Sequence, residues 1–361
     1  MSLRYRKITV KVGSNVLTNA DGTLNTDRIG HLVIQIAALR RQGVEVVLVT
    51  SGAVAAGRSE VKCTKKLDAV SARQLWSAVG QVKLINCYAG FFRHQGLVCA
   101  QVLTTKDNFA ERSHYLNMKN CFTTLLDNGV TPVVNENDTI SVTELMFTDN
   151  DELSGLIASM LDSEALIILT NVEGIYDGTP AAPDTRVIQE IGLHDTAWLE
   201  NIAPQKSGFG RGGMRTKSAM AHKVARDGIA VHIACGLHDN ILLDLLDSAK
   251  TVVHTTFKPA AHRSSNVKKW IAYSAGSAKG KLIINDGAVE ALFSSASSLL
   301  PIGVTAVEGI FRKDDIVSIE AQDGRTVGWG KTRYSSEMAA KEAGSKNSRP
   351  IIHYDYLYLD E

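Results

Sequence analysis

The sequence predicts an α/β protein: a three-layer αβα sandwich around a mainly parallel sheet, followed by a small all-β pseudo-barrel. Over the first two-thirds of the 361 residues, short and nearly continuous apolar runs alternate with helical patterns. Strands buried on both faces of a parallel sheet have such runs, and the alternation implies right-handed βαβ crossovers. The composition shifts near residues 255–277, and beyond this stretch short strands alternate with turns, which is typical of a small β domain.

The elements of the first domain follow from these patterns. Six runs are expected to form the sheet: ITVKVG, EVVLVTSG, LVCAQVL, VTPVVNEND, EALIILTN and IAVHIACG. Between the first two, apolar residues recur at helical spacing at Ile29, Leu32, Val33, Ile36 and Leu39. Gly43 ends that helix, and a second long helix is expected over roughly 71–94.

The predicted boundaries divide the chain into a catalytic domain at 1–257, a linker at 258–277 and a β domain at 278–361. The linker is rich in Ser, Ala, Lys and Arg and has no clear period. Beyond it, the runs GKLIIND, SLLPIGVTAVEG, DDIVSIEAQDG and TVGWGKTRY are expected to be strands separated by turns.

Composition excludes several classes of protein. Lys and Arg number 39 against 38 Asp and Glu, so no overall charge attracts nucleic acid or an anionic membrane. Five scattered cysteines without a C-x-x-C pair argue against a disulfide framework and a zinc site. The first residues do not form a signal peptide, and no apolar run reaches the roughly 18 residues of a membrane span. We therefore expect a soluble cytoplasmic protein.

Four polar turns directly follow predicted strands. They are GSN at 13–15, TSG at 50–52, NEND at 135–138 and TN at 170–171. Ligands of open α/β sheets bind beyond the carboxyl ends of the strands, so these turns are expected to line one site. Any one of them alone is explained by the ordinary need for turn residues at strand ends.

A Gly-rich loop, SGFGRGGMRTK at 207–217, resembles a P-loop but has Met214 where the P-loop lysine belongs. The residues after it predict a helix that ends at Gly228. A helix N-terminus offers free N–H groups to phosphate oxygens, and Lys217, one turn inside, can reach back over the loop. The alternative is a surface loop that leads into a solvated helix.

Two further features carry charge that a phosphate site can use. Lys11 lies inside the first apolar strand, where an ammonium is costly to bury unless it reaches water or meets an anion. The stretch 134–155 is rich in acidic residues and asparagine but lacks the spacing of a Ca²⁺ loop. Its carboxylates could orient lysines or bind a substrate ammonium, or Asn150 or Asp151 could simply cap a helix.

With these motifs together, the sequence resembles the glutamate 5-kinases, which belong to the amino acid kinase family and carry a C-terminal PUA domain. The resemblance covers nearly the whole chain. It rests on VKVGSNVLT, VTSGAVAAG, LWSAVGQ, PVVNENDTI, DNDELS and GGMRTK, and, after the linker, on KKWI and SSLLPIGV. The expected folds are therefore the amino acid kinase fold and a PUA-like pseudo-barrel.

The resemblance implies ATP-dependent phosphorylation of the side-chain carboxylate of L-glutamate to L-glutamyl 5-phosphate, the first step of proline biosynthesis. Mg²⁺ would accompany ATP, and no residue is expected to ligate a metal. Lys11, Lys217 and Asp151 would be catalytic, and Ser51, Asp138 and Asn150 would bind glutamate. The ATP-binding residues would be Lys11, Gly13, Gly52, Thr170, Asn171, Arg211, Gly212, Gly213, Met214, Arg215, Thr216 and Lys217.

The sequence departs from the family pattern near the nucleotide. Asn171 stands where the family has Asp, and Arg211 and Arg215 replace Thr and Ser of the Gly-rich loop. Thr148 replaces the glycine expected before Asp149, and Asp314 replaces a glycine in the PUA-like region. Asp tolerates a left-handed turn, so this last change is compatible with the fold.

Two other functions stay open from the sequence. One alternative is another kinase of the same family, for N-acetylglutamate, aspartate, UMP or carbamate. Asp138 favours a substrate with a free ammonium over one with an acetylated amine. An RNA-binding protein that acts through its PUA domain is a second alternative, although the near-neutral chain gives it no support. The resemblance further implies a homo-oligomer, dimer or tetramer, and feedback inhibition by proline.

Overall fold

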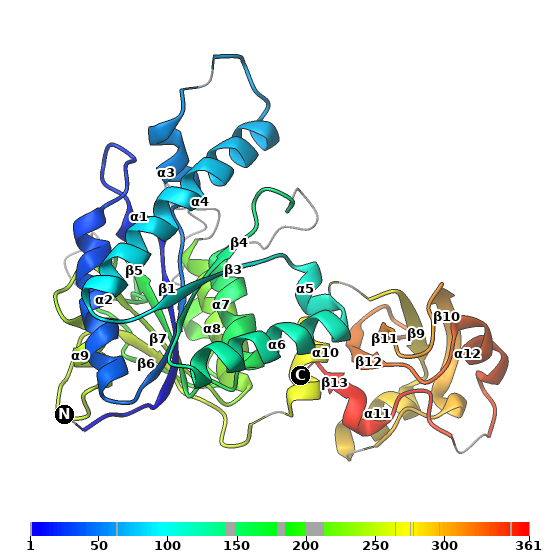
Figure 1. Cartoon of the computed structure of the whole chain (residues 1–361). Helices are drawn as coiled ribbons and strands as arrows, with labels where there is room; N and C mark the ends of the chain where they lie inside the picture. The colour runs from blue at the N-terminus through cyan, green and yellow to red at the C-terminus, as the bar shows by residue number, and fades with distance from the viewer. Residues whose placement is uncertain are drawn as a thin grey trace. The chain divides into compact units, whose positions relative to one another are not determined.

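The computed structural model describes residues 2–62, 64–141, 149–178, 185–199, 213–263, 265–274, 276, 278–295, 297–346 and 349–360. The chain forms two compact units (Figure 1). The first comprises Met1–Asn108 and Leu116–Arg263, and the second comprises Phe109–Tyr115 and Ser264–Glu361. Among the described residues, no helix has both the length and the apolar character that a membrane span needs.

The sheet of the first unit has the strand order β3-β4-β2-β1-β5-β7-β8-β6. Its strands are β1 (Lys7–Val12), β2 (Glu45–Val49), β3 (Cys99–Thr104), β4 (Thr131–Glu136), β5 (Ala165–Thr170), β6 (Glu190–Ile191), β7 (Ala230–Cys235) and β8 (Thr255–Phe257). Only the pairing of β7 with β8 is antiparallel among these neighbours. The six predicted runs form β1 to β5 and β7, which confirms the mainly parallel sheet.

Helices cover both faces of this sheet, as Figure 1 shows. Along β5, Ile167 and Leu169 pack with helices α2, α4 and α9, whereas Leu166 and Ile168 pack with α7 and α8. Successive side chains of a strand point to opposite faces, so the two clusters are the two interior layers of the predicted sandwich. The helices in this part of the chain are α1 (Ser14–Leu17), α2 (Thr26–Arg41), α3 (Ala53–Glu60), α4 (Ala69–His94), α5 (Asp107–Ala110), α6 (Arg112–Asp127), α7 (Asn150–Met160), α8 (Met214–Arg226) and α9 (Ile241–Leu246). Of these, α5 and α6 contain residues of the second unit.

The strand order brings the four polar turns of the sequence together. Strands β4, β2, β1 and β5 are consecutive and parallel, so their carboxyl ends lie along one edge. The turns that follow them contain the residues 13–15, 50–52, 135–138 and 170–171. The expectation that these turns are neighbours is confirmed.

The second unit is built on a five-stranded sheet of order β10-β9-β11-β12-β13. Its strands are β9 (Gly280–Ile284), β10 (Val304–Gly309), β11 (Ile316–Ala321), β12 (Thr326–Lys331) and β13 (Leu357–Leu359). The pairs are antiparallel except β9 with β11. Asp314 has φ 74°, so it adopts the left-handed conformation in place of a glycine.

The second unit also contains helices that its pattern of strands and turns did not predict. They are α10 (Asn266–Tyr273), α11 (Asp286–Ser294) and α12 (Ser336–Glu342). Helix α10 lies within the stretch expected to be a linker, and Ser265 caps its N-terminus. Its Trp270 is buried, and the indole Nε1 donates a hydrogen bond to the Phe109 carbonyl of the same unit.

Candidate active site

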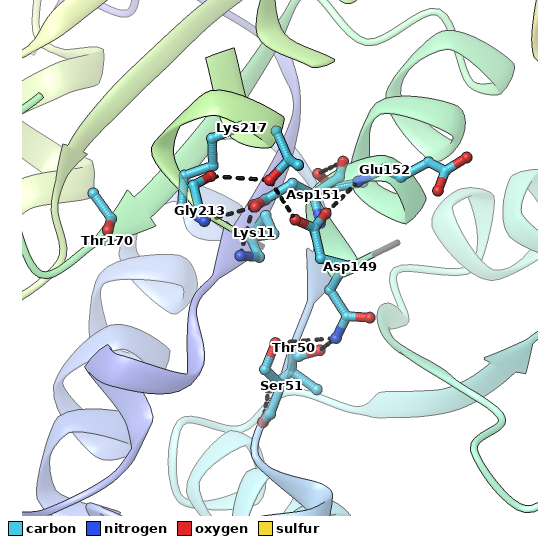
Figure 2. A network of polar contacts seen from close by, with 12 residues as sticks. Lys11, Thr50, Ser51, Asp149, Asp151, Glu152, Thr170, Gly213 and Lys217 are labelled. Atoms are coloured by element: carbon cyan, nitrogen blue, oxygen red, sulfur yellow. Dashed lines mark hydrogen bonds and ion pairs between the residues drawn. The ribbon is translucent and has the colours of Figure 1, made fainter. Parts of the chain in front are cut away.

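Two lysine ammonium groups share one buried carboxylate at the edge where the polar turns meet. Lys11 Nζ lies 2.6 Å from Asp151 Oδ1, and Lys217 Nζ lies 2.6 Å from Asp151 Oδ2 (Figure 2). Strand β1 supplies Lys11, the first turn of α7 supplies Asp151, and the first turn of α8 supplies Lys217. The Asp151 side chain is 1% exposed, so this carboxylate is the anion that makes the burial of Lys11 tolerable.

The charges of this cluster are strongly coupled. Burial alone would raise the pKa of Asp151, but the two ammonium groups hold that pKa down at about 2. Burial lowers the pKa of Lys11, and Asp151 opposes that shift only in part. For Lys217, burial also acts to lower the pKa, but the attraction of Asp151 prevails and the pKa is raised. The Asp149 carboxylate beside the cluster also attracts both ammonium groups. The two ammonium groups are the charges that an incoming anion would meet here.

The N-termini of α7 and α8 are tied together beside this cluster. Asp149 caps α7, since its Oδ1 accepts hydrogen bonds from the backbone amides of Asp151 and Glu152. Its Oδ2 accepts one from the Thr216 hydroxyl, which also lies 2.9 Å from the Gly213 carbonyl. Asp149 therefore fixes the first turn of α8, and with it Lys217, relative to Asp151.

The predicted helix after the Gly-rich loop is confirmed. Helix α8 begins at Met214 with Gly213 as its N-cap, and the turn after it contains Gly228 with φ 82°. Arg215 is exposed and Met214 is partly buried against the core. Arg211 and Gly212, both predicted to bind ATP, lie outside the described residues.

Two predicted ATP-binding glycines, Gly13 and Gly52, have different structural reasons to lack a side chain. A Cβ on Gly13 would lie 3.2 Å from the Leu169 carbonyl oxygen and 3.7 Å from Lys11 Nζ. Because glycine has no Cβ, this side of the Lys11 ammonium is not covered by a side chain at position 13. The Gly13 amide itself donates to Leu169. Gly52 has φ 101°, a left-handed conformation that favours glycine, and it caps α3.

A second group of polar side chains centres on Asn150. Its Nδ2 lies 2.7 Å from the Thr50 carbonyl, 3.0 Å from Ser51 Oγ and 3.0 Å from Asn135 Oδ1. Ser51 and Asn150, both predicted to bind glutamate, are therefore in direct contact. Asn150 directly precedes Asp151 in α7, so this group adjoins the lysine cluster.

Asp138, the third residue predicted to bind glutamate, is buried and paired with a residue that the sequence analysis missed. Arg73 donates to Asp138 Oδ1 through Nη2 at 2.5 Å and through Nε at 3.0 Å. Ser77 Oγ lies 3.3 Å from Asp138 Oδ2, and Arg73 Nη2 lies 3.8 Å from Glu136. Burial raises the pKa of Asp138, and the Arg73 guanidinium opposes that rise.

One face of α4 connects the two groups. Arg73, Ser77 and Gln81 recur every four residues, and Gln81 accepts a hydrogen bond from Asn135. A polar wall therefore runs from Asp138 along α4 to Asn135, Asn150 and Ser51. The sequence contained a signal for it, because polar residues at i, i+4 and i+8 interrupt an otherwise apolar helix face.

The turn after β5 carries the last predicted nucleotide residues. Thr170 ends β5 and is buried, whereas Asn171 is exposed. Thr170 Oγ1 lies 3.4 Å from Asn171 Oδ1. Both residues follow the strand adjacent to β1, so they lie on the same sheet edge as Lys11.

Comparisons with known proteins give the chain two family matches. Residues 6–235 match the amino acid kinase family, and residues 280–354 match the PUA domain. The glutamate 5-kinase of Bacteroides thetaiotaomicron is 55% identical over 361 residues, with both chains covered completely. The glutamate 5-kinase of Chlorobaculum tepidum is 48% identical over 357 residues, which cover 98% of each chain.

Solved structures show the same fold in more distant proteins. A carbamate kinase from Giardia lamblia, bound to AMP-PNP, is 20% identical with a TM-score of 0.51, over 72% of this chain and all of that one. The isopentenyl phosphate kinase of T. acidophilum, in a product complex, is 15% identical with a TM-score of 0.50, over 70% of this chain and all of that one.

Proposed function

The chain belongs to the amino acid kinase family and, within it, to the glutamate 5-kinases, and from this premise we propose how its residues carry out that reaction. The reaction transfers the γ-phosphoryl group of ATP to the side-chain carboxylate of L-glutamate, the first step of proline biosynthesis. The observation that carries the proposal is the pair of ammonium groups on Asp151.

The lysines act on the phosphoryl group in transit. A carboxylate oxygen of glutamate attacks the γ-phosphorus, the bond to the β–γ bridging oxygen breaks, and ADP leaves with the electron pair. Negative charge spreads over the transferring oxygens, so positioned positive charge is the main source of rate. Lys11 and Lys217 supply that charge, and Asp151 holds both side chains in place. A carboxylate is already a nucleophile, so the reaction needs no general base.

The nucleotide lies along the edge from β2 to β5 in this proposal. Lys11, Gly13, Gly52, Thr170 and Asn171 contact ATP there. The first turn of α8, residues 213–217, contributes its free N–H groups and positive helix end to the phosphates. Arg211 and Gly212 belong to the same proposed set.

Glutamate lies along the polar wall. Its ammonium meets Asp138, and Ser51 and Asn150 hold the carboxylate that receives the phosphoryl group. Asn150 is suited to this role because its neighbour in the chain is Asp151, which orients the lysines. The substrate thus spans the distance between the two groups of polar residues.

Mg²⁺ would accompany ATP in this proposal and, when bound, would supply charge neutralisation to its phosphates. The acidic side chains at the lysine cluster are already engaged: both Asp151 oxygens meet ammonium groups, and both Asp149 oxygens accept hydrogen bonds. The donor set therefore fits a metal held mainly by phosphate oxygens and water, which is a common arrangement for Mg²⁺.

Regulation and assembly extend the proposal. We propose a cytoplasmic homo-oligomer, inhibited by proline, with residues 1–257 as the catalytic part. Millimolar proline should lower the rate at subsaturating glutamate, and light scattering should give a mass of two or four chains. An unchanged rate or a monomer mass would remove the corresponding part of the proposal.

An ATP-dependent hydroxamate assay tests the function. Hydroxylamine traps an acyl phosphate formed from L-glutamate, N-acetyl-L-glutamate or L-aspartate. A signal with L-glutamate alone supports the proposal. A signal only with another acid keeps the fold and the lysine cluster but overturns the substrate, and no signal with any acid overturns the reaction.

A further inference from the structure

The pairing of Arg73 with Asp138 points to a binding role beyond the reaction itself. Both carboxylates in contact with Arg73, Glu136 and Asp138, are nearly fully buried, whereas 28% of the Arg73 side chain is exposed. The arginine thus forms the solvent-facing member of a charge pair whose acidic member lies beneath it. A ligand that reaches Asp138 must come into contact with Arg73 as well.

An α-amino acid has charges complementary to this pair. It carries an ammonium and a carboxylate on the same carbon, so it presents opposite charges at short range, as Asp138 and Arg73 do. Arginine is the side chain best suited to carboxylate because its fork donates two parallel hydrogen bonds. Contacts with Nη2 and Nε of Arg73 and with Ser77 keep the Asp138 carboxylate in position for an ammonium.

We propose that Arg73 binds the α-carboxylate of the amino-acid substrate while Asp138 binds its ammonium. The pair then selects free α-amino acids over simple dicarboxylates and over ω-amino acids. This inference rests on the proposed function and adds the residue that distinguishes the two ends of glutamate. The side-chain carboxylate, which Asn150 and Ser51 hold near the lysines, becomes the acceptor because the α-carboxylate is retained by Arg73.

Two substrate analogues separate the roles of the two residues. Glutarate lacks the ammonium of glutamate, and 4-aminobutyrate lacks its α-carboxylate. With wild-type enzyme, the kcat/KM for L-glutamate and the inhibition constants of both analogues are measured in the hydroxamate assay. Absence of wild-type activity with L-glutamate would overturn the proposed function before Arg73 is tested.

The Arg73→Gln variant gives the decisive comparison. We expect kcat/KM for L-glutamate to fall about ten- to a hundredfold through KM, as for a lost charged hydrogen bond, while the inhibition constant of 4-aminobutyrate stays within about threefold. In the Asp138→Asn variant, kcat/KM for L-glutamate should also fall, because the partner of its ammonium is lost. The inhibition constant of glutarate, which has no ammonium, should stay unchanged. Arg73→Lys should recover part of the loss. If Arg73→Gln weakened inhibition by 4-aminobutyrate by the same factor as it lowered kcat/KM for L-glutamate, the proposal would be overturned. The arginine would then have only a structural role.

A second and independent feature is a group of three metal-ligating side chains at the ends of β5 and β7. Ligand atoms of Glu173, Cys235 and His238 lie within 4.8 Å of one another, and no other such group occurs among the residues that the structure describes. His238 Nε2 lies 2.7 Å and 2.9 Å from the two carboxylate oxygens of Glu173. Cys235 and His238 come from one turn, in the spacing C-x-x-H.

The turn after β7 holds Cys235 and His238 at a fixed spacing. The His238 backbone amide donates a hydrogen bond to the Cys235 carbonyl at 3.5 Å. Gly236 donates to the Thr170 carbonyl at 2.7 Å, which fixes this turn against the end of β5, the strand that leads to Glu173.

We infer that Glu173, Cys235 and His238 bind a divalent zinc-type cation. Thiolate, imidazole and carboxylate together are the ligands of Zn²⁺, and three protein ligands leave a fourth position for water. On binding, the Cys235 thiol loses its proton to solvent and a sulfur–metal bond forms. Two atoms that bind the same Zn²⁺ through bonds of about 2.0 to 2.3 Å lie at most about twice that length apart. The three ligand atoms here already lie within 4.8 Å of one another, so small side-chain rotations would bring them into coordinating positions.

Cobalt gives a direct readout of this site in the full chain. After treatment with a chelator, added Co²⁺ should produce a thiolate-to-cobalt charge-transfer band that one equivalent of Zn²⁺ removes. Cys235→Ser should abolish the band and weaken Zn²⁺ binding about a hundredfold or more, while Cys99→Ser, at a cysteine outside the group, should keep both. Circular dichroism checks that each variant is folded. No band in the wild type, or the same band in Cys235→Ser, would overturn the inference.

Discussion

Lys217 and Asp151, which come from the first turns of two different helices, lie 2.6 Å apart between their charged atoms, and Lys11 meets the other oxygen of the same carboxylate. This relationship is the structural basis of the proposed mechanism. The carboxylate holds two like charges close together, where they would otherwise repel each other. It thereby holds two ammonium groups in positions that are set before any phosphate arrives.

Replacing that carboxylate should cost both stability and rate. In Asp151→Asn, two buried ammonium groups lose their counter-charge, so we expect a loss of about 3 kcal/mol or more in the free energy of unfolding. The kcat should fall as the lysines move apart. Urea denaturation and the hydroxamate assay measure the two effects. Asp127→Asn, at an exposed position at the end of α6, serves as the control, and an equal stability in both variants would contradict the role of Asp151.

The hydrogen bond that joins the two helix N-termini should matter for catalysis because it fixes the position of the first turn of α8. Thr216→Val removes the hydroxyl that bonds to Asp149, which frees the first turn of α8 and displaces Lys217. We expect kcat/KM for ATP to fall roughly tenfold or more, since small displacements of positioned groups are costly. Thr216→Ser keeps the hydroxyl and should stay near wild type. Equal activity of the valine and serine variants would show that the tie is dispensable.

Asn150 should determine the affinity for glutamate. Asn150→Asp has the same shape but places a negative charge beside the carboxylate that the proposal puts there. The KM for L-glutamate should rise tenfold or more, as for a charged contact turned unfavourable, with the KM for ATP nearly constant. Asn128→Asp at an exposed site is the matched control. A rise confined to the KM for ATP would place Asn150 at the nucleotide instead.

Acid should destabilise the protein through a buried histidine. Burial, together with His254 and Arg4, lowers the pKa of His232 to about 3, and Tyr5 and Thr256 hydrogen-bond its ring. The unfolded chain therefore binds a proton below its ordinary pKa of about 6.5 that the folded chain does not. Stability attributable to His232 is complete above that pH and is lost as the pH falls toward 3.

This loss should amount to about 2 to 3 kcal/mol at pH 4.5. His254, whose pKa burial also lowers, adds to it in the same direction. Melting temperatures measured from pH 7 to 4.5 should fall less steeply in His232→Gln than in the wild type. Parallel curves would contradict the assignment. Asp151 does not contribute in this range, because its pKa is lowered and its stabilisation is lost only below about pH 4.

The sequence alone predicted the site residues that lie at the carboxyl ends of strands and at the N-termini of helices. Apolar runs located β1, β2, β4 and β5, and their order in a parallel sheet placed Lys11, Ser51 and Thr170 at one edge. The helix after the Gly-rich loop gave the position of Lys217. These features are local, so periodicity and turn chemistry are enough to predict them.

Features that depend on long-range packing were not predictable in the same way. The contact of Arg73 with Asp138 requires α4 to lie across the end of β4, and nothing local to either residue shows that. The role of Asp149 depends on Thr216, which lies in a different helix. In the second unit, α10, α11 and α12 have only 8, 9 and 7 residues, which is too short for a helical period to be read from the sequence.

The turnover of Lys217→Ala with L-glutamate tests the central claim most directly. In the hydroxamate assay with Mg²⁺ and ATP, we expect kcat to fall by roughly a hundredfold or more, as for a lost transition-state donor, with both KM values changed only a few-fold. Lys217→Arg, which keeps the charge, should retain more activity than the alanine variant. A kcat near that of the wild type in Lys217→Ala would contradict the account, because the second ammonium on Asp151 would then have no part in the transfer.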